Sequence, residues 1–470
     1  MKRGFMLFIA GWSLWAMAAH AADWPTFRGN LQRTGCVDGR NGPQKPRVLW
    51  VYEAHEHFIA SPSTDGTSLF VSGLGAFNTP VFHALSLDAG AAKRELWSKR
   101  PPMLKLPVVC SPAIVDGRLV FGDGMHQTDG ATLFCVKSDS GVPLWQLPVP
   151  GTLVHLESAP TIADGRAFIG GGAAGVICVD LSRLVLDGKE VDLAAAQAII
   201  DGKWKEMQAR YEADKKKDPD FAIPPSEADL PRPQPRKLWQ AGKDKWHVDA
   251  PVAVAGERVL VASSYLDVEK CGDRSVLCLN AADGSVKWRA ALDVDPWAGP
   301  TVQQNVVFAG CSTIRFDPKE IPRGRGQVVA LNMDDGRVLW KKDLAGGVIS
   351  PVVACGQMVI CAATDGRLYA LSAADGSAKW TYDAGAAMFA APAVAGDTVY
   401  CGDLKGVIHA VRASTGTALW KLDLSAAPVN APGMVYSSPI VHGGRLYAAT
   451  CNLDAPAGQN KTVIVCIGDE

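Results

Sequence analysis

The chain has 470 residues, of which 48% are hydrophobic, 20% are charged and 8% are aromatic. These are the proportions of a globular protein, so a disordered chain, a collagen and a polytopic membrane protein are excluded. The 47 Lys and Arg residues balance 48 Asp and Glu residues, a net charge of -1, and this balance excludes a charge-driven nucleic-acid or anionic-lipid binder.

The first 21 residues have the pattern of a secretory signal peptide. Two basic residues, at positions 2 and 3, precede an apolar run over residues 5–18, and Ala19-His20-Ala21 fits the small-x-small cleavage pattern. No cysteine stands at the cleavage point, and no later apolar run reaches the length needed to span a bilayer. We expect an exported protein, periplasmic or secreted, with no lipid anchor and no transmembrane span after signal cleavage; an uncleaved anchor helix is the alternative.

The rest of the chain repeats one pattern. Each repeat opens with a Pro-containing pair, continues through two β-rich runs and an Asp/Gly turn, and ends at a Trp. Eight openings occur, at Ser61, Ser111, Ala159, Ala250, Gly299, Ser350, Ala391 and Ser438. The period is mostly 40 to 52 residues, which predicts four-stranded propeller blades rather than helical repeats.

A small residue, a Gly and a Trp recur at fixed spacing within the repeats, as in Ala370, Gly376 and Trp380. We expect the small residue on the third strand to leave room that a Trp on the fourth strand fills against the neighbouring blade. Eight Trp residues are predicted to serve this docking: Trp50, Trp97, Trp145, Trp239, Trp288, Trp340, Trp380 and Trp420.

The last repeat ends before its Trp, whereas Trp50 lies in a strand-like run that precedes the first opening. A ring closed by its own N-terminal strand explains both facts, because an open sheet edge would leave backbone groups unpaired. The predicted fold is an all-β, eight-bladed propeller of four-stranded antiparallel blades, in which the N-terminal strand completes the last blade. We expect it to be a monomer.

The third repeat carries an insertion over residues 182–236. A stripe of apolar side chains at helical spacing, from Leu193 to Tyr211, predicts a helix, and a Pro-rich return follows it. Two roles are open for this insertion: a helix that caps the propeller, or a docking surface for a partner.

The repeats resemble the tryptophan-docking repeats of the PQQ-like propeller family, in its BamB-like branch, over about residues 47–470. Residues 23–29, with the sequence Asp-Trp-Pro-Thr-Phe-Arg-Gly, resemble the mature start of many bacterial members. The organisation expected is a signal peptide over 1–21, a lead-in over 22–46 and a propeller over 47–470 that contains the 182–236 insertion. The resemblance implies either a scaffold like the BamB-type outer-membrane assembly factors or a redox enzyme like the quinoprotein alcohol dehydrogenases.

Polar residues precede the inner strands of several predicted blades, where blade topology brings the inter-blade loops together at the axial mouth. Loops are where sites usually lie, so we take this face as the functional one. A histidine beside a carboxylate suits a divalent metal or acid–base chemistry; a water-filled polar vestibule, a cofactor or a bound peptide are the other interpretations. The candidate ligand-binding residues are His57, His155, Glu157, His247, Asp249, Asp295 and Trp297.

The sequence argues against an enzyme. The resemblance implies a vicinal Cys-Cys pair near the cofactor of a quinoprotein dehydrogenase, but no two of the 12 cysteines are adjacent. There is no Cys-x-x-Cys-His for haem, and the glycine-rich run over residues 170–175 lies between predicted strands, so it is interpreted as a turn. We expect no catalytic residues and no cofactor, with PQQ and calcium as the alternative.

The cysteines divide into two groups. Four occupy the small docking position on different blades and are expected to remain unpaired: Cys135, Cys178, Cys278 and Cys466. The other eight can form at most one or two disulfides in an oxidising compartment.

The function predicted is a non-catalytic binding scaffold for another envelope protein, in the manner of outer-membrane protein assembly. Two alternatives stay open. One is a quinone- or metal-dependent periplasmic oxidoreductase, and the other is a binder of carbohydrate or another small ligand that uses Phe77, Trp297 and Tyr436 at the mouth.

Overall fold

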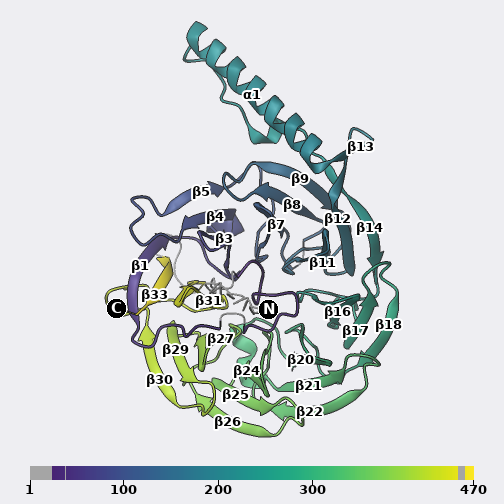
Figure 1. Cartoon of the computed structure of the whole chain (residues 1–470), viewed down its shortest axis with the longest axis vertical. Helices are drawn as coiled ribbons and strands as arrows, with labels where there is room; N and C mark the ends of the chain where they lie inside the picture. The colour runs from purple at the N-terminus through teal and green to yellow at the C-terminus, as the bar shows by residue number, and fades with distance from the viewer. Residues whose placement is uncertain (1–23, 37–38, 127, 454–460, 470) are drawn as a thin grey trace, which may run out of the picture.

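A computed structural model describes residues 24–36, 39–126, 128–453 and 461–469. The predicted signal peptide over residues 1–21 lies outside these ranges. Within them, the strands form eight antiparallel sheets that stand as blades around one axis, so the eight-bladed propeller is confirmed (Figure 1). No helix in the described ranges combines the length and the apolar character needed to cross a membrane.

Blades 1 to 4 follow one another along the chain. Blade 1 contains β2 (Ser63–Thr64), β3 (Ser68–Leu74), β4 (Pro80–Ser86) and β5 (Glu95–Lys99). Blade 2 contains β6 (Ala113–Val115), β7 (Arg118–Gly122), β8 (Ala131–Lys137) and β9 (Pro143–Val149). Blade 3 contains β10 (Thr161–Ala163), β11 (Arg166–Gly170), β12 (Val176–Leu186) and β14 (Gln234–Ala241), with β13 (Lys189–Asp192) added to β12. Blade 4 contains β15 (Ala253–Ala255), β16 (Arg258–Ser263), β17 (Ser275–Asn280) and β18 (Val286–Ala291).

Blades 5 to 8 complete the ring. Blade 5 contains β19 (Pro300–Gln303), β20 (Val306–Ser312), β21 (Gly326–Asn332) and β22 (Val338–Leu344). Blade 6 contains β23 (Val353–Cys355), β24 (Met358–Ala362), β25 (Arg367–Ser372) and β26 (Ala378–Asp383). Blade 7 contains β27 (Ala393–Ala395), β28 (Thr398–Gly402), β29 (Val407–Arg412) and β30 (Ala418–Asp423). Blade 8 contains β31 (Ile440–His442), β32 (Arg445–Ala449), β33 (Thr462–Gly468) and β1 (Arg47–Ala54).

The ring closes through its two ends, as predicted. Strand β1 pairs antiparallel with β33, and Trp50 is the register partner of Cys466. Blade 8 is therefore built from both ends of the propeller sequence, which removes the open edge that either end alone would leave.

The tryptophan docking has a regular geometry. In every blade the Trp of the outer strand is the register partner of the small residue on the third strand: Trp97 with Ala84, Trp145 with Cys135, Trp239 with Cys178, Trp288 with Cys278, Trp340 with Ala330, Trp380 with Ala370, Trp420 with Ala410, and Trp50 with Cys466. Five indoles then donate a hydrogen bond to a backbone carbonyl of the next blade, as Trp288 does to Met333 at 2.9 Å. Each such Trp therefore links two blades by packing and by a hydrogen bond.

The glycine of the repeat is explained by the same contact. Gly336, in the hairpin between β21 and β22, has a positive φ of 73° and lies against the indole of Trp288 from the preceding blade. A Cβ atom there would come within 2.4 Å of the ring, so only glycine fits both the turn and the approach.

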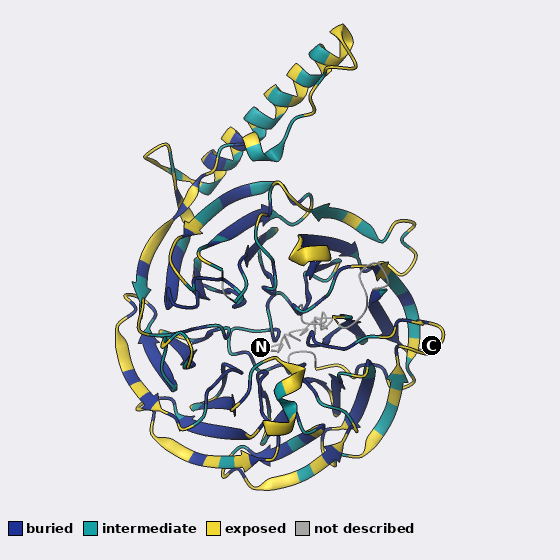
Figure 2. Cartoon of the chain, turned by 180° about the vertical axis from the view of Figure 1, so that it is seen from behind, coloured by how far each residue is buried: buried dark blue, intermediate teal, exposed yellow. Residues whose placement is uncertain are grey.

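The insertion projects from the rim and does not lie across either face of the ring, so it is not a cap (Figure 1). Helix α1 (Leu193–Lys217) begins at Asp192, whose side chain accepts a hydrogen bond from the Ala195 amide. Only Ala196 and Ile200 of the helix are buried, and its outer part is largely exposed (Figure 2). Lys137 of blade 2 forms an ion pair with Asp201 at 2.9 Å, which fixes the base of the helix.

Short 3-10 turns lie in three of the connecting segments, at η1 (Ala76–Asn78), η2 (Glu227–Asp229) and η3 (Pro318–Arg323). The first and third belong to loops that join a second strand to a third strand, and the second belongs to the return of the insertion.

The lead-in covers the axis at one face of the ring. Its backbone carbonyls from Trp24 to Gly35 accept hydrogen bonds from the inner strands of six blades. The bonded residues of these strands are Thr64, Ile114, Val254, Val302, Ala354 and Val394. None of them is the first residue of its strand, where the inter-blade loop ends, and Cys36 of the lead-in is bonded to Cys355, the last residue of β23. The lead-in therefore lies toward the face opposite to the inter-blade loops.

Two arginines hold this lead-in in place, and both are buried. Arg33 donates to the carbonyls of Val252, Ala159 and Pro160, each at 3.1 Å, and Arg28 donates to the carbonyls of Val352 and Pro392. Burial lowers the pKa of each guanidinium to about 9. Carbonyl dipoles from four different blades therefore replace water around the two cations.

One disulfide ties the lead-in to the ring. Cys36 is bonded to Cys355 at the end of β23, with their Cα atoms 6.0 Å apart. The four cysteines at the docking positions are buried and unpaired, as predicted. Sequence reasoning limited the number of disulfides but did not give this pairing.

Candidate functional site

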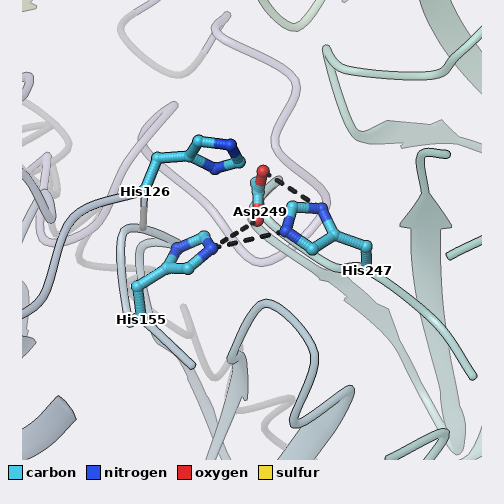
Figure 3. A group of neighbouring side chains, drawn as sticks. All are labelled: His126, His155, His247 and Asp249. Carbon is cyan, nitrogen blue, oxygen red and sulfur yellow. Dashed lines mark hydrogen bonds and ion pairs between the residues drawn. The ribbon is translucent and has the colours of Figure 1, made fainter. Parts of the chain in front are cut away.

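Three histidines and one aspartate meet at the face opposite to the lead-in (Figure 3). His126 lies in the loop between β7 and β8, His155 in the connection between blades 2 and 3, and His247 and Asp249 in the connection between blades 3 and 4. One donor atom from each side chain lies within 4.8 Å of the donor atoms of the other three. We call these four residues the histidine cluster.

The contacts within the histidine cluster are short. His155 Nε2 lies 3.4 Å from His247 Nε2 and 3.4 Å from Asp249 Oδ1. His247 Nδ1 lies 3.3 Å from Asp249 Oδ2, and the ring of His126 stands edge-on to both other rings, at centroid distances of 5.5 and 5.7 Å. Asp249 thus contacts both buried imidazoles, one with each carboxylate oxygen.

The backbone around the histidine cluster explains why two imidazoles can be buried there. Val248 exchanges two backbone hydrogen bonds with Gly172, in the glycine-rich turn between β11 and β12. A Cβ atom on Gly172 would lie 2.7 Å from His155 Nε2. The glycine-rich run over residues 170–175 is a turn, as predicted, and it gives His155 its space.

Burial and neighbouring charges have opposing effects on the pKa values in and beside the histidine cluster. Burial lowers the pKa of His126 and of His247, which favours neutral imidazoles. Burial alone would raise the pKa of Asp249, but the positive charge that His247, His155, His126 and Arg315 can carry beside it outweighs burial and holds this pKa below its ordinary value. Burial raises the pKa of Glu157, whose Oε1 lies 3.5 Å from His155 Nδ1. The positive charge around Asp249 thus favours its carboxylate form, whereas burial disfavours the charged forms of His126, His247 and Glu157.

Arg315 extends over the histidine cluster from the loop between β20 and β21. Its Nη1 atom lies 3.2 Å from His126 Nε2, and its guanidinium carbon lies 5.3 Å from the centre of the Trp297 ring. Trp297 is only 9% exposed and stands 6.5 Å from His247. The open side of the cluster is thus bordered by a cation held on an indole.

The predicted site residues do not all converge. His155, Glu157, His247 and Asp249 meet, and Trp297 lies beside them. Asp295 instead accepts hydrogen bonds from the Tyr265 amide and Arg274, at 2.7 and 2.9 Å, and so supports a neighbouring loop.

His57 also lies outside the histidine cluster, because it belongs to the connection between blades 8 and 1. Its Nδ1 accepts a hydrogen bond from the Asn452 amide at 3.1 Å. His126 was missed by sequence reasoning, since it does not precede an inner strand and no carboxylate stands two residues from it, as one does from His155 and His247. Its position in a long loop of the face already taken as functional was the available signal.

The aromatic residues proposed for a carbohydrate site are not assembled into one platform. Phe77 is fully exposed at its loop tip, whereas Trp297 and Tyr436 are 9% and 8% exposed. Tyr436 donates its hydroxyl to the Phe316 carbonyl at 3.1 Å, so its ring supports a loop.

The fold and the mouth define a closed eight-bladed propeller with a polar axial site at one face. The family model described as "Outer membrane protein assembly factor BamB" matches residues 42–198, 229–320 and 321–463. The chain therefore belongs to this family of PQQ-like propellers. No curated protein sequence matches the chain.

Solved structures with the same fold have low sequence identity to the chain. BamB from Moraxella catarrhalis has 13% identity and a TM-score of 0.58, covering 90% of this chain and 97% of its own. Quinohemoprotein alcohol dehydrogenase from Comamonas testosteroni has 14% identity and a TM-score of 0.61, covering 97% and 82%. A europium-containing methanol dehydrogenase has 12% identity and a TM-score of 0.63, covering 96% and 98%. These similarities concern the fold.

The mouth of this chain does not fit a PQQ cofactor. Arg315 lies over one face of the Trp297 indole, and only 9% of this residue is exposed, so the ring leaves little surface on which a planar quinone could stack. Cys271 is partly exposed and outside the disulfide, and the sequence gives it no adjacent cysteine. The donors at the centre are mainly imidazoles, whereas calcium prefers oxygen ligands.

Proposed function

We propose that the chain is an exported, non-catalytic binding scaffold of the cell envelope, and that it binds an envelope or outer-membrane protein through the face that carries the histidine cluster. Membership of the BamB family supports the binding role and a periplasmic location. The signal-peptide pattern of the first 21 residues supports export.

The observation that carries the choice of face is a set of exposed apolar side chains at its loop tips. Four loops that join a second strand to a third strand each present one: Phe77, Val268, Phe316 and Leu453, exposed by 103%, 86%, 49% and 46%. Exposed apolar side chains gathered on one face are typical of a protein-binding surface. The opposite face is covered at the axis by the lead-in.

Site-specific photo-cross-linking in living cells tests this proposal. A photoreactive residue at Phe77 or Val268 should give a discrete adduct with one envelope protein, identified by mass spectrometry. The matched control positions are Asp283 and Asp335, which are exposed in hairpins of the opposite face. Adducts from the control positions only, or none from Phe77 and Val268, would refute the proposed face.

The main alternative is a quinone-dependent oxidoreductase, which the similarity in fold to quinohemoprotein alcohol dehydrogenase raises. Dye-linked alcohol oxidation, measured with added PQQ and calcium, separates the two functions. A binding scaffold predicts a rate equal to that of the protein-free control.

A further inference from the structure

We propose that the histidine cluster binds one divalent transition-metal ion of the zinc type through His126, His155, His247 and Asp249. The inference deepens the proposed function, because it assigns a ligand to the same face. It rests on distances, burial and donor chemistry at the mouth.

The separation of the donor atoms is that of metal ligands. A tetrahedral zinc ion with Zn–N bonds of about 2.0–2.1 Å holds neighbouring ligand atoms about 3.3–3.4 Å apart. His155 Nε2 lies 3.4 Å from both His247 Nε2 and Asp249 Oδ1. Two imidazole nitrogens at this distance form a long hydrogen bond at best, whereas a shared metal ion would use both lone pairs.

The burial of the histidine cluster supports a metal site independently of the types of its residues. His155 and His247 are 1% and 0% exposed, and His155 Nδ1, His247 Nδ1 and Asp249 Oδ1 have no hydrogen-bond partner among the described residues. A buried carboxylate oxygen without a donor is costly. A cation between Asp249 Oδ1 and the two Nε2 atoms would remove that cost.

The outer contacts place a carboxylate oxygen beside the second ring nitrogen of each buried histidine, at ion-pair distance rather than in a hydrogen bond. A metal-ligating histidine directs its second ring nitrogen at a carboxylate, which fixes the tautomer and the ring orientation. His155 Nδ1 faces Glu157 Oε1 at 3.5 Å, and His247 Nδ1 faces Asp249 Oδ2 at 3.3 Å. Both buried imidazoles therefore present Nε2 to the centre of the histidine cluster.

The donor types select the metal. Three imidazoles and one carboxylate favour zinc and related transition metals, whereas calcium and magnesium prefer oxygen ligands. His126 is partly exposed and comes from the loop between β7 and β8, so it completes the coordination from the open side. Arg315 contacts His126 from that side and separates the histidine cluster from solvent.

Metal titration of the chelator-treated mature protein tests the inference. Calorimetry and competition with a chromogenic chelator should give one zinc ion per chain, with calcium bound at least about tenfold more weakly. His155→Ala and Asp249→Asn should each weaken zinc binding by at least about tenfold. Cobalt(II) should give the intense visible absorption of a tetrahedral site, and His126→Ala should change that spectrum.

His55→Ala is the matched control, because His55 is an exposed histidine of the same face outside the histidine cluster. Circular dichroism checks that each variant is folded. If His155→Ala does not fold, Asp249→Asn still tests the inference, because asparagine has nearly the same shape as aspartate. Zinc affinity that is equal in the wild type and Asp249→Asn, or absent from the wild type, overturns the inference. Cross-linking from Phe77 tests protein binding, and metal titration tests zinc binding. Each proposal can therefore fail without the other.

Discussion

The Nε2 atoms of His155 and His247 lie 3.4 Å apart, although 92 residues separate the two histidines in the sequence. Blade 3 and its insertion occupy that interval, and the connections before and after the blade return to the same face. The propeller topology alone creates this proximity, because each inner strand begins near the axis. Two residues that look unrelated in sequence thereby become neighbours in one buried site.

Arg315 should weaken metal binding, because its positive charge stands beside His126 at 3.2 Å. Arg315→Gln is therefore expected to raise the affinity for zinc by about threefold to tenfold at low ionic strength, with a smaller effect in high salt. Calorimetric titration measures this change. Arg323→Gln, at an exposed arginine of the same loop, should leave the affinity unchanged. Weaker binding by Arg315→Gln would show instead that Arg315 positions His126.

The repeats carried most of the information about the fold. The spacing of Ala370, Gly376 and Trp380 reports a contact that recurs in every blade, and Trp50 stood where the closing strand had to be. A repeated contact can be recognised in sequence because each copy confirms the others. The blade count and the closure were therefore predictable.

The site was predictable only in part. His155 and Glu157, and likewise His247 and Asp249, stand two residues apart in the sequence, so each pair drew attention. His126 belongs to no such pair, and its meeting with them depends on the path of one loop across the mouth. The pairing of Cys36 with Cys355 and the burial of Arg33 depend in the same way on where the lead-in lies. A contact that occurs only once in the fold has no repeated counterpart in the sequence by which it could be recognised.

The docking tryptophans should differ in how much the hydrogen bond of the indole nitrogen contributes to the free energy of unfolding. Trp288 donates to Met333 at 2.9 Å, whereas Trp145 Nε1 has no hydrogen-bond partner in the described part of the chain. Trp288→Ala should lower the free energy of unfolding by about 3–5 kcal/mol. Trp288→Phe should cost about 1 kcal/mol more than Trp145→Phe, since only the former loses a hydrogen bond. Urea unfolding measures both, and equal costs for the two Phe variants would contradict the assignment.

The lead-in should stabilise the ring through Arg33. Arg33→Met leaves the carbonyls of Val252, Ala159 and Pro160 without this donor, and we expect a loss of about 3 kcal/mol or more in unfolding free energy. Arg33→Lys should restore only part of it, because an ammonium cannot reproduce the fork of the guanidinium. Arg47→Met, at an exposed arginine, is the control. A loss of similar size in both Met variants would contradict the role of Arg33.

The disulfide between the lead-in and the ring can be detected by counting the thiols of the denatured protein. Cys36 and Cys355 form a disulfide, so denatured Cys36→Ser should titrate one thiol more than the denatured wild-type protein, because Cys355 loses its partner. Cys36→Ser should also lower the unfolding free energy by about 2–4 kcal/mol, because the denatured chain loses a long cross-link. Cys271→Ser removes an unpaired cysteine that is partly exposed and should leave stability near that of the wild type. Twelve thiols in the wild type isolated from an oxidising compartment would refute the bond.

Asp403 should make the stability of blade 7 depend on pH in the acid range. Its carboxylate accepts hydrogen bonds from the Lys405 and Val407 amides at 2.9 Å and faces His409 Nε2 at 3.0 Å. Burial opposes ionisation, but His409 and these backbone donors outweigh burial and hold the pKa of Asp403 below its ordinary value. The folded state therefore binds this proton more weakly than the unfolded state does.

The sign of the effect follows from that difference. The contribution of Asp403 is fully present above the pKa of the unfolded chain and is lost as the pH falls through the lower pKa of the folded protein. Asp403→Asn should thus be less stable than the wild type at neutral pH, by about 1–3 kcal/mol. The gap should narrow once the pH falls below about 4. Thermal unfolding of both proteins across this range measures it, and a gap that stays constant with pH would show that Asp403 does not carry this acid dependence.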